Sequence, residues 1–553
     1  MIRRVRFWKL GCTRPGRDGA PGMGSVDALG AVEPDSPPPP ARPGHWLTRF
    51  LILRLLGLVY LMAFLTWVNQ GPALFGSHGL LPAASAFERV EDALGSRRAA
   101  FWQEPSLFWL ADGDRFLFGA GWLGVGISIL LLAGYGNALA LLVLLVLQVS
   151  VLPAGQTFYS FGWELQLVET GFLALFLVPL LDGRPFPRRP PSLVAIWLFR
   201  WLIVRIMWGA GLIKLRGDPC WRDLTCLDFH FQTQPVPNPL SPWFHGLPAA
   251  AHRAGVLFNH VAELLAPFFV FGPRRVRHVA GAVMATLQLV LLASGNLSFL
   301  NWLTLVPILA CFDDGVWSRI LPRRLVAHAR RAAAVATPSR AQSRLAQAAA
   351  IVVAVLSVPV MINLASGEQA MNTSFTRLPL VNTYGAFGSV GRERNELVFE
   401  GTSDATVTPS TRWTPYAFKC KPGDPARRPC WMSPYHYRLD WLMWFAAMRG
   451  PGDYPFVAHF VWKLLRGDPA TVELLAGDPF AGTPPHFVRV ELYRYEMATP
   501  PAKVWWTRTR LAEWLPPLSL DHAGLRRFLE AQGWDSDAPP PAGALDRPPA
   551  RRE

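Results

Sequence analysis

The chain has 553 residues, of which 51% are hydrophobic and only 17% are charged. This composition excludes a wholly disordered chain, and six cysteines are too few for a disulfide-knotted scaffold. The net charge of +15 is compatible with binding to nucleic acid, with binding to an anionic membrane or with export-related sorting, so the positions of the charges must decide.

The two ends of the chain differ in composition from its middle. Residues 1–45 are basic and rich in glycine and proline, and residues 536–553 are rich in proline. We predict that both segments are disordered. The first segment lacks an apolar run followed by a small-residue cleavage site, so we do not expect a cleaved signal peptide.

Long apolar stretches fill residues 46–364 and predict a multipass transmembrane helical domain. A helix needs about 20 apolar residues to cross ~30 Å of hydrocarbon, so the two shortest stretches are candidates for re-entrant segments. We expect about nine spans, at residues 47–68, 116–134, 136–153, 165–181, 193–213, 254–272, 277–294, 297–312 and 346–364.

Arginine and lysine predict which loops face the cytoplasm. The N-terminal arm is rich in arginine, and so are three internal loops, at residues 182–192, 273–277 and 313–345. The loops at 154–164 and 295–296 contain neither arginine nor lysine. With an odd number of spans, this pattern places the N-terminus in the cytoplasm and residues 365–553 outside. Because the arginines flank membrane spans, we expect no binding to nucleic acid.

Residues 365–535 predict one extracytoplasmic α+β domain, with a small β-sandwich as one arrangement open to it. Short β-like runs occupy Glu396–Glu400 and Pro415–Lys419, and Phe487–Tyr495 alternates apolar and charged residues. Leu439–Met448 and Lys463–Leu475 have helical character. The predicted fold class is therefore a polytopic α-helical membrane protein with a C-terminal extracytoplasmic α+β domain.

Five charged residues lie inside the predicted spans, where a charge is costly and is by default functional. They are Arg54, Glu169, Arg200, Arg205 and Glu263. One interpretation is a set of structural ion pairs that fix helix packing. The other is a ligand-binding or catalytic pocket, which would make the protein a membrane-embedded enzyme.

The outer loop at residues 214–253 is the densest polar segment. Its candidate site residues are Lys214, Asp218, His230, Gln234 and His245. The two histidines and the aspartates near them match no standard metal-ligand spacing, so we expect a loop packed on the outer domain and no metal. The chain contains no Walker A, GxSxG or HExxH motif, and we expect no cofactor.

Four of the six cysteines fall in two predicted outer segments, as Cys220 with Cys226 and Cys420 with Cys430. An oxidising compartment favours two local disulfides. Free thiols are equally compatible with the sequence. Neither pair has CxxC spacing, so a thioredoxin-like redox site is not indicated.

Several long motifs resemble the lipase maturation factor family. The resemblance runs from about residue 47 to residue 520. In the apolar half the motifs are LRLLGLVYLMAF at 53–64, FGWELQLVETGFLA at 161–174, RWLIVRIMWGAGLIKLRGDPCWRDLT at 200–225 and FHFQTQPVPNP at 229–239. In the outer domain they are VNTYG at 381–385, FKCKPGD at 418–424 and RLDWLMWFAA at 438–447.

The resemblance implies a multipass membrane protein that helps secreted lipases to fold and assemble and that is not itself an enzyme. Animal members reside in the endoplasmic reticulum (ER) membrane, and the implied partners are the lipid bilayer and a secreted lipase or another exported client. A bias toward arginine over lysine, with 51 prolines, favours a bacterial source instead. The client-facing or domain-core residues implied are Asn382, Tyr384, Gly385, Lys421, Asp424, Arg438, Asp440, Trp441 and Trp444.

Overall fold

The computed structural model describes residues 44–499 and 502–534 of the chain. These described residues form one compact unit. Apart from residues 44 and 45, the two segments predicted to be disordered lie outside the described residues.

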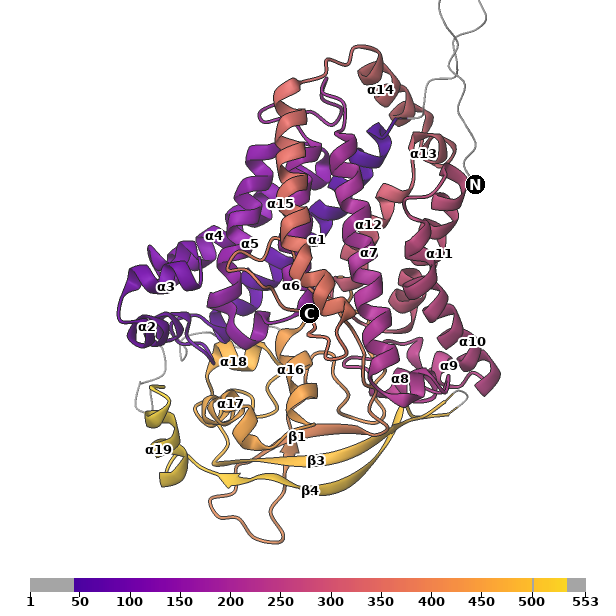
Figure 1. Cartoon of the computed structure of the whole chain (residues 1–553). Helices are drawn as coiled ribbons and strands as arrows, with labels where there is room; N and C mark the ends of the chain where they lie inside the picture. The colour runs from indigo at the N-terminus through magenta and orange to yellow at the C-terminus, as the bar shows by residue number, and fades with distance from the viewer. Residues whose placement is uncertain (1–43, 500–501, 535–553) are drawn as a thin grey trace, which may run out of the picture. The chain divides into compact units, whose positions relative to one another are not determined.

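Six helices are long and apolar enough to cross a membrane, and each coincides with a predicted span. They lie side by side in a bundle (Figure 1). Their bounds are α1 (Trp46–Leu74), α4 (Asp114–Ala133), α5 (Ala138–Gly155, continued by the 3-10 turn η2, Gln156–Tyr159), α7 (Leu193–Arg216), α11 (Arg274–Ser294) and α15 (Arg340–Ala365).

The other three predicted spans are shorter helical segments, so the count of about nine becomes six long helices and three short segments. Each short segment has a proline within it or just after it (Pro179, Pro267 or Pro307), which limits the length of a regular helix. Their bounds are α6 (Gly162–Ala174) with η3 (Leu175–Leu177), α10 (Ala249–His260) with the π-helical turn η5 (Val261–Leu265) and η6 (Ala266–Phe269), and α12 (Leu300–Ile308) with η7 (Leu309–Cys311).

Two of the short segments, those that contain α6 and α12, still run from one end of the bundle to the other. Near the start of α6, Glu164 forms an ion pair with Arg438 of the C-terminal region. At the end of η3, the carbonyl oxygen of Leu177 accepts a hydrogen bond from Arg49, in the first turn of α1. The segment that contains α12 likewise contacts the C-terminal region at one end and α1 at the other.

The arginine-rich loops meet at the end of the bundle where α1 begins. The first backbone N–H groups of α1 donate to Asp314, and Arg274 pairs with the adjacent Asp313 at 2.7 Å. Arg189 donates to the carbonyl oxygen of Thr337 at 2.8 Å, which joins two of these loops. In Figure 1 the short helices α13 (Asp314–Ile320) and α14 (Arg323–Ala334) lie at this end, opposite the β-sheet.

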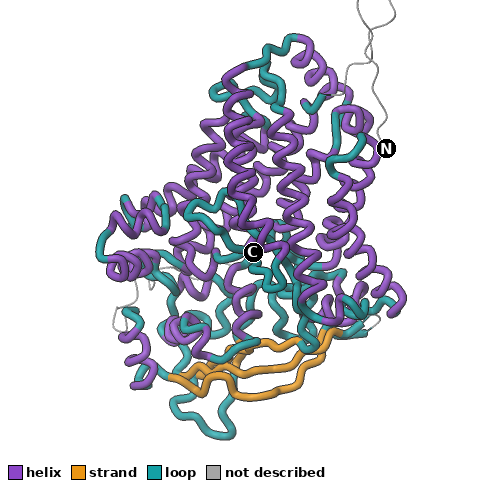
Figure 2. Tube along the Cα trace, viewed as in Figure 1, coloured by secondary structure: helices purple, strands orange, loops and turns teal. Residues whose placement is uncertain are grey.

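The C-terminal region contains one four-stranded antiparallel sheet, in the order β2-β1-β3-β4, drawn in orange in Figure 2. The β-sandwich interpretation is therefore wrong for the described residues. The run at Pro415–Lys419 contributes only the end of a two-residue strand, and β4 is not among the predicted strands. The strands are β1 (Arg394–Thr402), β2 (Thr414–Pro415), β3 (Phe487–Met497) and β4 (Trp506–Leu518).

Helices lie between this sheet and the bundle (Figure 1). Helix α16 packs against β1, close to its predicted position, and α17 packs against β3. The helix predicted at Lys463–Leu475 is instead the end of α17 followed by the short helix α18. The C-terminal helices are α16 (Arg438–Ala446), η8 (Pro451–Asp453), α17 (Phe456–Leu465), α18 (Pro469–Glu473) and α19 (Ala523–Ala531). The remaining short helices are α2 (Ala83–Leu94), α3 (Arg97–Gln103), η1 (Leu107–Trp109), η4 (Pro219–Trp221), α8 (Leu227–Thr233) and α9 (Ser241–His245).

Candidate functional site

A buried ion pair between α6 and α7 holds the segment that follows α15. Glu169 and Arg205 are in direct contact, and both side chains are at most 1% exposed. The Glu169 carboxylate also accepts hydrogen bonds from the Tyr384 hydroxyl at 2.6 Å and the Asn382 backbone N–H at 3.0 Å. Arg205 donates to the Asn382 carbonyl oxygen at 3.1 Å. Both charges therefore fix residues 381–385 against the bundle.

A second buried ion pair joins α6 to α16. Glu164 and Arg438 approach to 2.6 Å, and both side chains are fully buried. The amide of Gln148 on α5 and the indole of Trp163 donate to the Glu164 carboxylate at 2.8 and 3.0 Å. The Arg438 guanidinium stacks 3.6 Å above the ring of Tyr159. We call the ion pairs Glu169–Arg205 and Glu164–Arg438 the two clamps. Both tie a segment that follows α15 to helix α6.

Glu164 is absent from the charges predicted inside the spans, because the predicted span begins one residue later, at 165. Its sequence signal is the FGWE start of an apolar helix, five residues before Glu169. Its partner Arg438 appears only among the residues that the family resemblance implies. Nothing in the sequence indicates that these two residues meet, since 274 positions separate them.

The other predicted intramembrane charges lie apart from these clamps. Glu263 pairs with Lys214 at 2.5 Å, and both contact the side chain of Asn259. Arg54 donates to the carbonyl oxygen of Phe50, one turn earlier in α1. Arg200 donates to the carbonyl oxygen of Ala310 at 2.8 Å. The five charges therefore form separate contacts and no single cluster.

This arrangement favours a structural role for the intramembrane charges. A catalytic carboxylate must reach the reacting atoms of its substrate. Glu169 and Glu263 are instead each engaged by a basic side chain and by further hydrogen bonds. None of the five predicted charges lines the large cavity described below.

The candidate residues of the outer loop do not converge on one point. Asp218 accepts the N–H of Cys220 and pairs with Arg392 at 3.0 Å. His230 is buried against the ring of Phe387, and burial lowers its pKa to about 4. Gln234 donates to the carbonyl oxygen of Ser294, and His245 ends the short helix α9. Burial also lowers the pKa of His245.

The structure joins Cys220 to Cys226 and Cys420 to Cys430 as disulfides. Of the two alternatives left open by the sequence, the structure therefore adopts the disulfide for both pairs. Among the described residues, the only grouping with metal-ligand geometry is Asp218 with Cys220 and Cys226. The two sulfur atoms in that grouping are already bonded to each other.

Several residues implied by the family resemblance lie in the core of the C-terminal domain. Glu396 on β1 pairs with both Lys421 (2.8 Å) and Arg394 (2.6 Å), and all three are buried. Asp440 accepts the backbone N–H groups of Cys420 and Lys421, and burial raises its pKa. Asp424, in contrast, lies at the surface.

A cavity of about 760 Å³ lies between the clamps, where the bundle meets the C-terminal domain. Tyr384, Gly385, Trp441 and Trp444 line it, so it gathers four of the residues implied by the family resemblance. Trp441 is buried, whereas Trp444 and its neighbour Phe445 are half-buried. Further lining residues include Phe161 and Trp163, which belong to the motif at 161–174, together with Leu297, Leu300 and Met371.

Two family models match the chain. The lipase maturation factor transmembrane domain matches residues 47–319, and the lipase maturation factor C-terminal domain matches residues 380–516. Lipase maturation factor 1 of Bos taurus is 46% identical over 547 residues, covering 92% of this chain and 97% of that protein. Its Homo sapiens counterpart is 44% identical over 543 residues, covering 92% and 95%.

A second set of relatives is more distant. Lipase maturation factor 2 of Mus musculus is 28% identical over 613 residues, covering 89% of this chain and 86% of that protein. No solved structure matches the chain. The relatives named here are mammalian, so they give no support to the bacterial source favoured by composition.

Proposed function

Since the chain belongs to the lipase maturation factor family, we propose that it is a membrane-bound maturation factor that helps secreted lipases or other exported proteins to fold and assemble. Membership rests on relatives that are up to 46% identical over almost the whole chain. The names of those relatives refer to lipases, which makes a lipase the first client to test. Their mammalian origin favours the ER membrane as the compartment.

The observation that best supports client binding is the aromatic cavity between the bundle and the C-terminal domain. A partly folded client exposes apolar side chains, and burying them gains about 25 cal/mol per Å². Aromatic anchors in desolvated pockets dominate the energy of many interfaces. The half-buried Trp444 and Phe445, together with Met371, offer such contacts at the edge of the cavity.

The proposed orientation has the N-terminus in the cytoplasm and the C-terminal domain in the ER lumen. Clustering of the arginine-rich loops at the opposite end of the bundle supports it, because basic loops stay on the cytoplasmic side. Both disulfides lie in the predicted outer segments. This location agrees with the proposed orientation, because the oxidising ER lumen favours disulfide formation.

Glycosylation tags test this orientation. An Asn-Xaa-Thr acceptor inserted in the exposed loop at residues 403–410 should be glycosylated in microsomes. The same acceptor inserted at residues 182–184, among the arginine-rich loops, should remain unmodified. The reverse pattern would refute the orientation.

The function is tested in cells that lack their own maturation factor and express a secreted lipase. Wild-type chain should restore lipase activity in the medium. Met371→Asp places a charge in the cavity wall and should reduce that activity severalfold, because an unpaired charge opposes apolar binding.

Leu378→Asp is the matched control, since Leu378 has similar exposure (47% against 42%), lies in the same segment and is not among the lining residues. The membrane level of each variant is measured in parallel. Equal lipase secretion with wild type and Met371→Asp, at equal protein levels, would argue against the cavity as the client site.

A further inference from the structure

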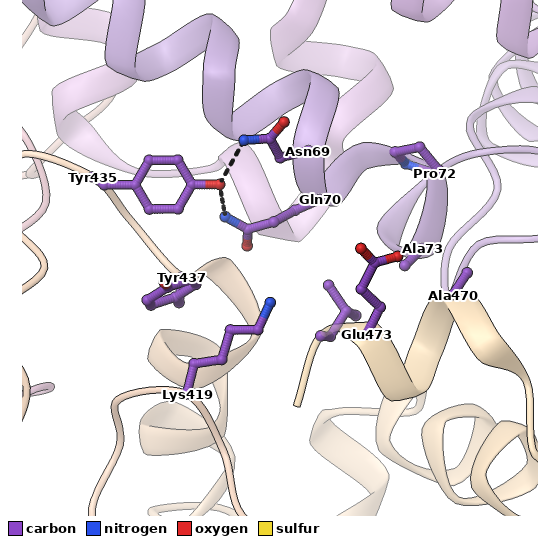
Figure 3. A pocket seen from close by; sticks show the side chains of 10 residues that line it. Asn69, Gln70, Pro72, Ala73, Lys419, Tyr435, Tyr437, Ala470 and Glu473 are labelled. Carbon is purple, nitrogen blue, oxygen red and sulfur yellow. Dashed lines mark hydrogen bonds between the residues drawn. The ribbon is translucent and has the colours of Figure 1, made fainter. Parts of the chain in front are cut away.

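A second, polar pocket of about 520 Å³ lies where the C-terminal end of α1 meets the C-terminal domain (Figure 3). It shares no lining residue with the aromatic cavity. Asn69 and Gln70 of α1 contribute polar groups on one side, and the C-terminal domain contributes Lys419, Tyr435 and Glu473. The clamps and the proposed client site make no use of these polar groups.

A chain of hydrogen bonds fixes the direction in which the Tyr435 hydroxyl can donate. The side-chain oxygen of Gln70 accepts the backbone N–H of Arg438 at 2.9 Å, so its nitrogen must be the donor. That nitrogen donates to the carbonyl oxygen of His436 and to the Tyr435 hydroxyl at 3.1 Å. Asn69 donates weakly to the same hydroxyl oxygen. The Tyr435 O–H proton is therefore left without an acceptor among the described residues, on a side chain that lines the pocket.

Lys419 supplies a cation in the same pocket as this hydroxyl. Its ammonium lies 5.5 Å from the ring centre of Tyr437, which in turn packs edge-on against Tyr435 at 5.3 Å. The ammonium and the free O–H both face the pocket, and in the view of Figure 3 the Gln70 amide lies between them. The Lys419 ammonium forms no ion pair or hydrogen bond with any described residue. A pocket that offers a positive charge and an unused O–H donor is suited to an anion that has several oxygen atoms.

Glu473 presents the opposite charge across the same pocket. It ends helix α18, and Figure 3 shows its carboxylate near Ala73, on the other side from Tyr435. Its carboxylate accepts no hydrogen bond and forms no ion pair with any residue that the structure describes. Lys419 and Glu473 therefore remain available to different parts of one ligand.

We propose that this pocket binds a zwitterionic phosphate ester of the phosphoethanolamine type. The phosphate lies between Lys419 and the Tyr435 hydroxyl, and the ligand ammonium faces Glu473. Asn69 directly follows the predicted span at residues 47–68, so the pocket lies close to the level where lipid headgroups begin. The same chemistry occurs in a lipid headgroup and in a soluble metabolite, and the experiment distinguishes these two sources.

The test uses the purified full-length protein and isothermal titration with soluble phosphoethanolamine and with inorganic phosphate. Lys419→Gln should weaken both ligands about tenfold, the loss expected for one charge-assisted hydrogen bond. Glu473→Gln should weaken phosphoethanolamine severalfold but tighten inorganic phosphate, because it removes the ammonium partner and a charge that repels the anion. These opposite signs are specific to a zwitterion site.

Lys503→Gln and Glu513→Gln are matched controls, because both residues are exposed and neither lines the pocket. Since Lys419 and Glu473 make no ion pair with described residues, their variants should keep the wild-type melting temperature. Wild-type affinities for both ligands in the two pocket variants would overturn the proposal.

A second experiment, with lipids, identifies the source of the ligand. The protein is reconstituted in nanodiscs that contain phosphatidylethanolamine or phosphatidylglycerol, and retained lipids are counted by native mass spectrometry. If the wild-type protein retains phosphatidylethanolamine and the Glu473→Gln variant does not, the site binds a lipid headgroup. Binding of the soluble ester without lipid retention assigns it to a soluble ligand. Binding of neither ligand would overturn the proposal.

Discussion

The two ends of the helical bundle use arginine in different ways. At the end where α1 begins, arginines such as Arg323, Arg330 and Arg331 are exposed. At the end that carries the C-terminal domain, Arg205, Arg394 and Arg438 are buried, each against a carboxylate. The first group contributes little stability, because exposed charges are well solvated. The second group joins segments that are distant in the sequence.

The buried and the exposed arginines should differ in how much their removal lowers the free energy of unfolding. Removing one partner of a buried ion pair typically costs about 3–5 kcal/mol, because the other charge is left uncompensated. Removing an exposed charge usually changes stability by less than about 0.5 kcal/mol. The variants below probe the difference on the full-length protein in detergent.

The largest effect is expected for Arg438→Met, which leaves Glu164 without its cation. We expect a loss of about 3–5 kcal/mol in the free energy of unfolding, measured by chemical denaturation. The double variant Glu164→Gln/Arg438→Met removes both charges and should recover part of that loss. If the double variant is no more stable than Arg438→Met, the two residues do not act as a pair.

Acid should lower the stability of the folded protein through protonation of His230. This residue lies outside the membrane spans, at the end of the bundle that carries the C-terminal domain. Burial lowers its pKa to about 4, against about 6.5 in an unfolded chain. The unfolded chain therefore takes up the proton first, so stability is lost as the pH falls from about 6.5 to 4. Linkage gives about 3 kcal/mol at pH 4 for this group.

His230→Asn isolates this contribution, since other buried histidines such as His459 remain. The melting temperature of the variant should fall less steeply than that of wild type between pH 7 and pH 5. Parallel curves for the two proteins would show that His230 titrates normally in the folded state.

A smaller loss is expected for Tyr384→Phe, which removes the hydroxyl that donates to Glu169 while the ion pair stays in place. A hydrogen bond to a charged group contributes about 1.5–3 kcal/mol. Tyr437→Phe is the control, because the Tyr437 hydroxyl makes no hydrogen bond with a described residue. Denaturation midpoints should rank wild type and the control together, above Tyr384→Phe.

The smallest effect is expected at the arginine-rich end. Arg330→Gln on α14 should change the free energy of unfolding by less than about 0.5 kcal/mol, because Arg330 is exposed. A loss comparable to that of Arg438→Met would abolish the distinction between the two ends.

Much of this architecture can be predicted from the sequence, because apolar runs and basic loops are local signals. The six long helices, β1, β3 and α16 fall close to their predicted positions. Strand β4 is missed because its exposed face is charged and Pro516 and Pro517 interrupt its end. The single sheet could not be told from a sandwich, since strand pairing is a long-range property.

The candidate site is only partly predictable. Glu169 and Arg205 stand out as charges in apolar helices, but their partners Asn382 and Tyr384 lie far along the chain. The residue types of the polar pocket, such as Lys419 and Glu473, are ordinary for a surface. Their proposed role depends on the hydrogen-bond directions around Gln70, which the sequence does not specify.

The clamp at Glu169 and Arg205 also has a consequence for how the protein is made. Arg205 cannot form its hydrogen bond to Asn382 until that residue has been synthesised, 177 residues later. At about 5–20 residues per second, that interval lasts roughly 10–35 s. During this interval Glu169 and Arg205 can form their ion pair in the membrane, but they lack their final hydrogen bonds to residues 382 and 384. The nascent bundle thus stays incomplete until the C-terminal domain begins to emerge, which couples insertion of the helices to folding of the domain that follows them.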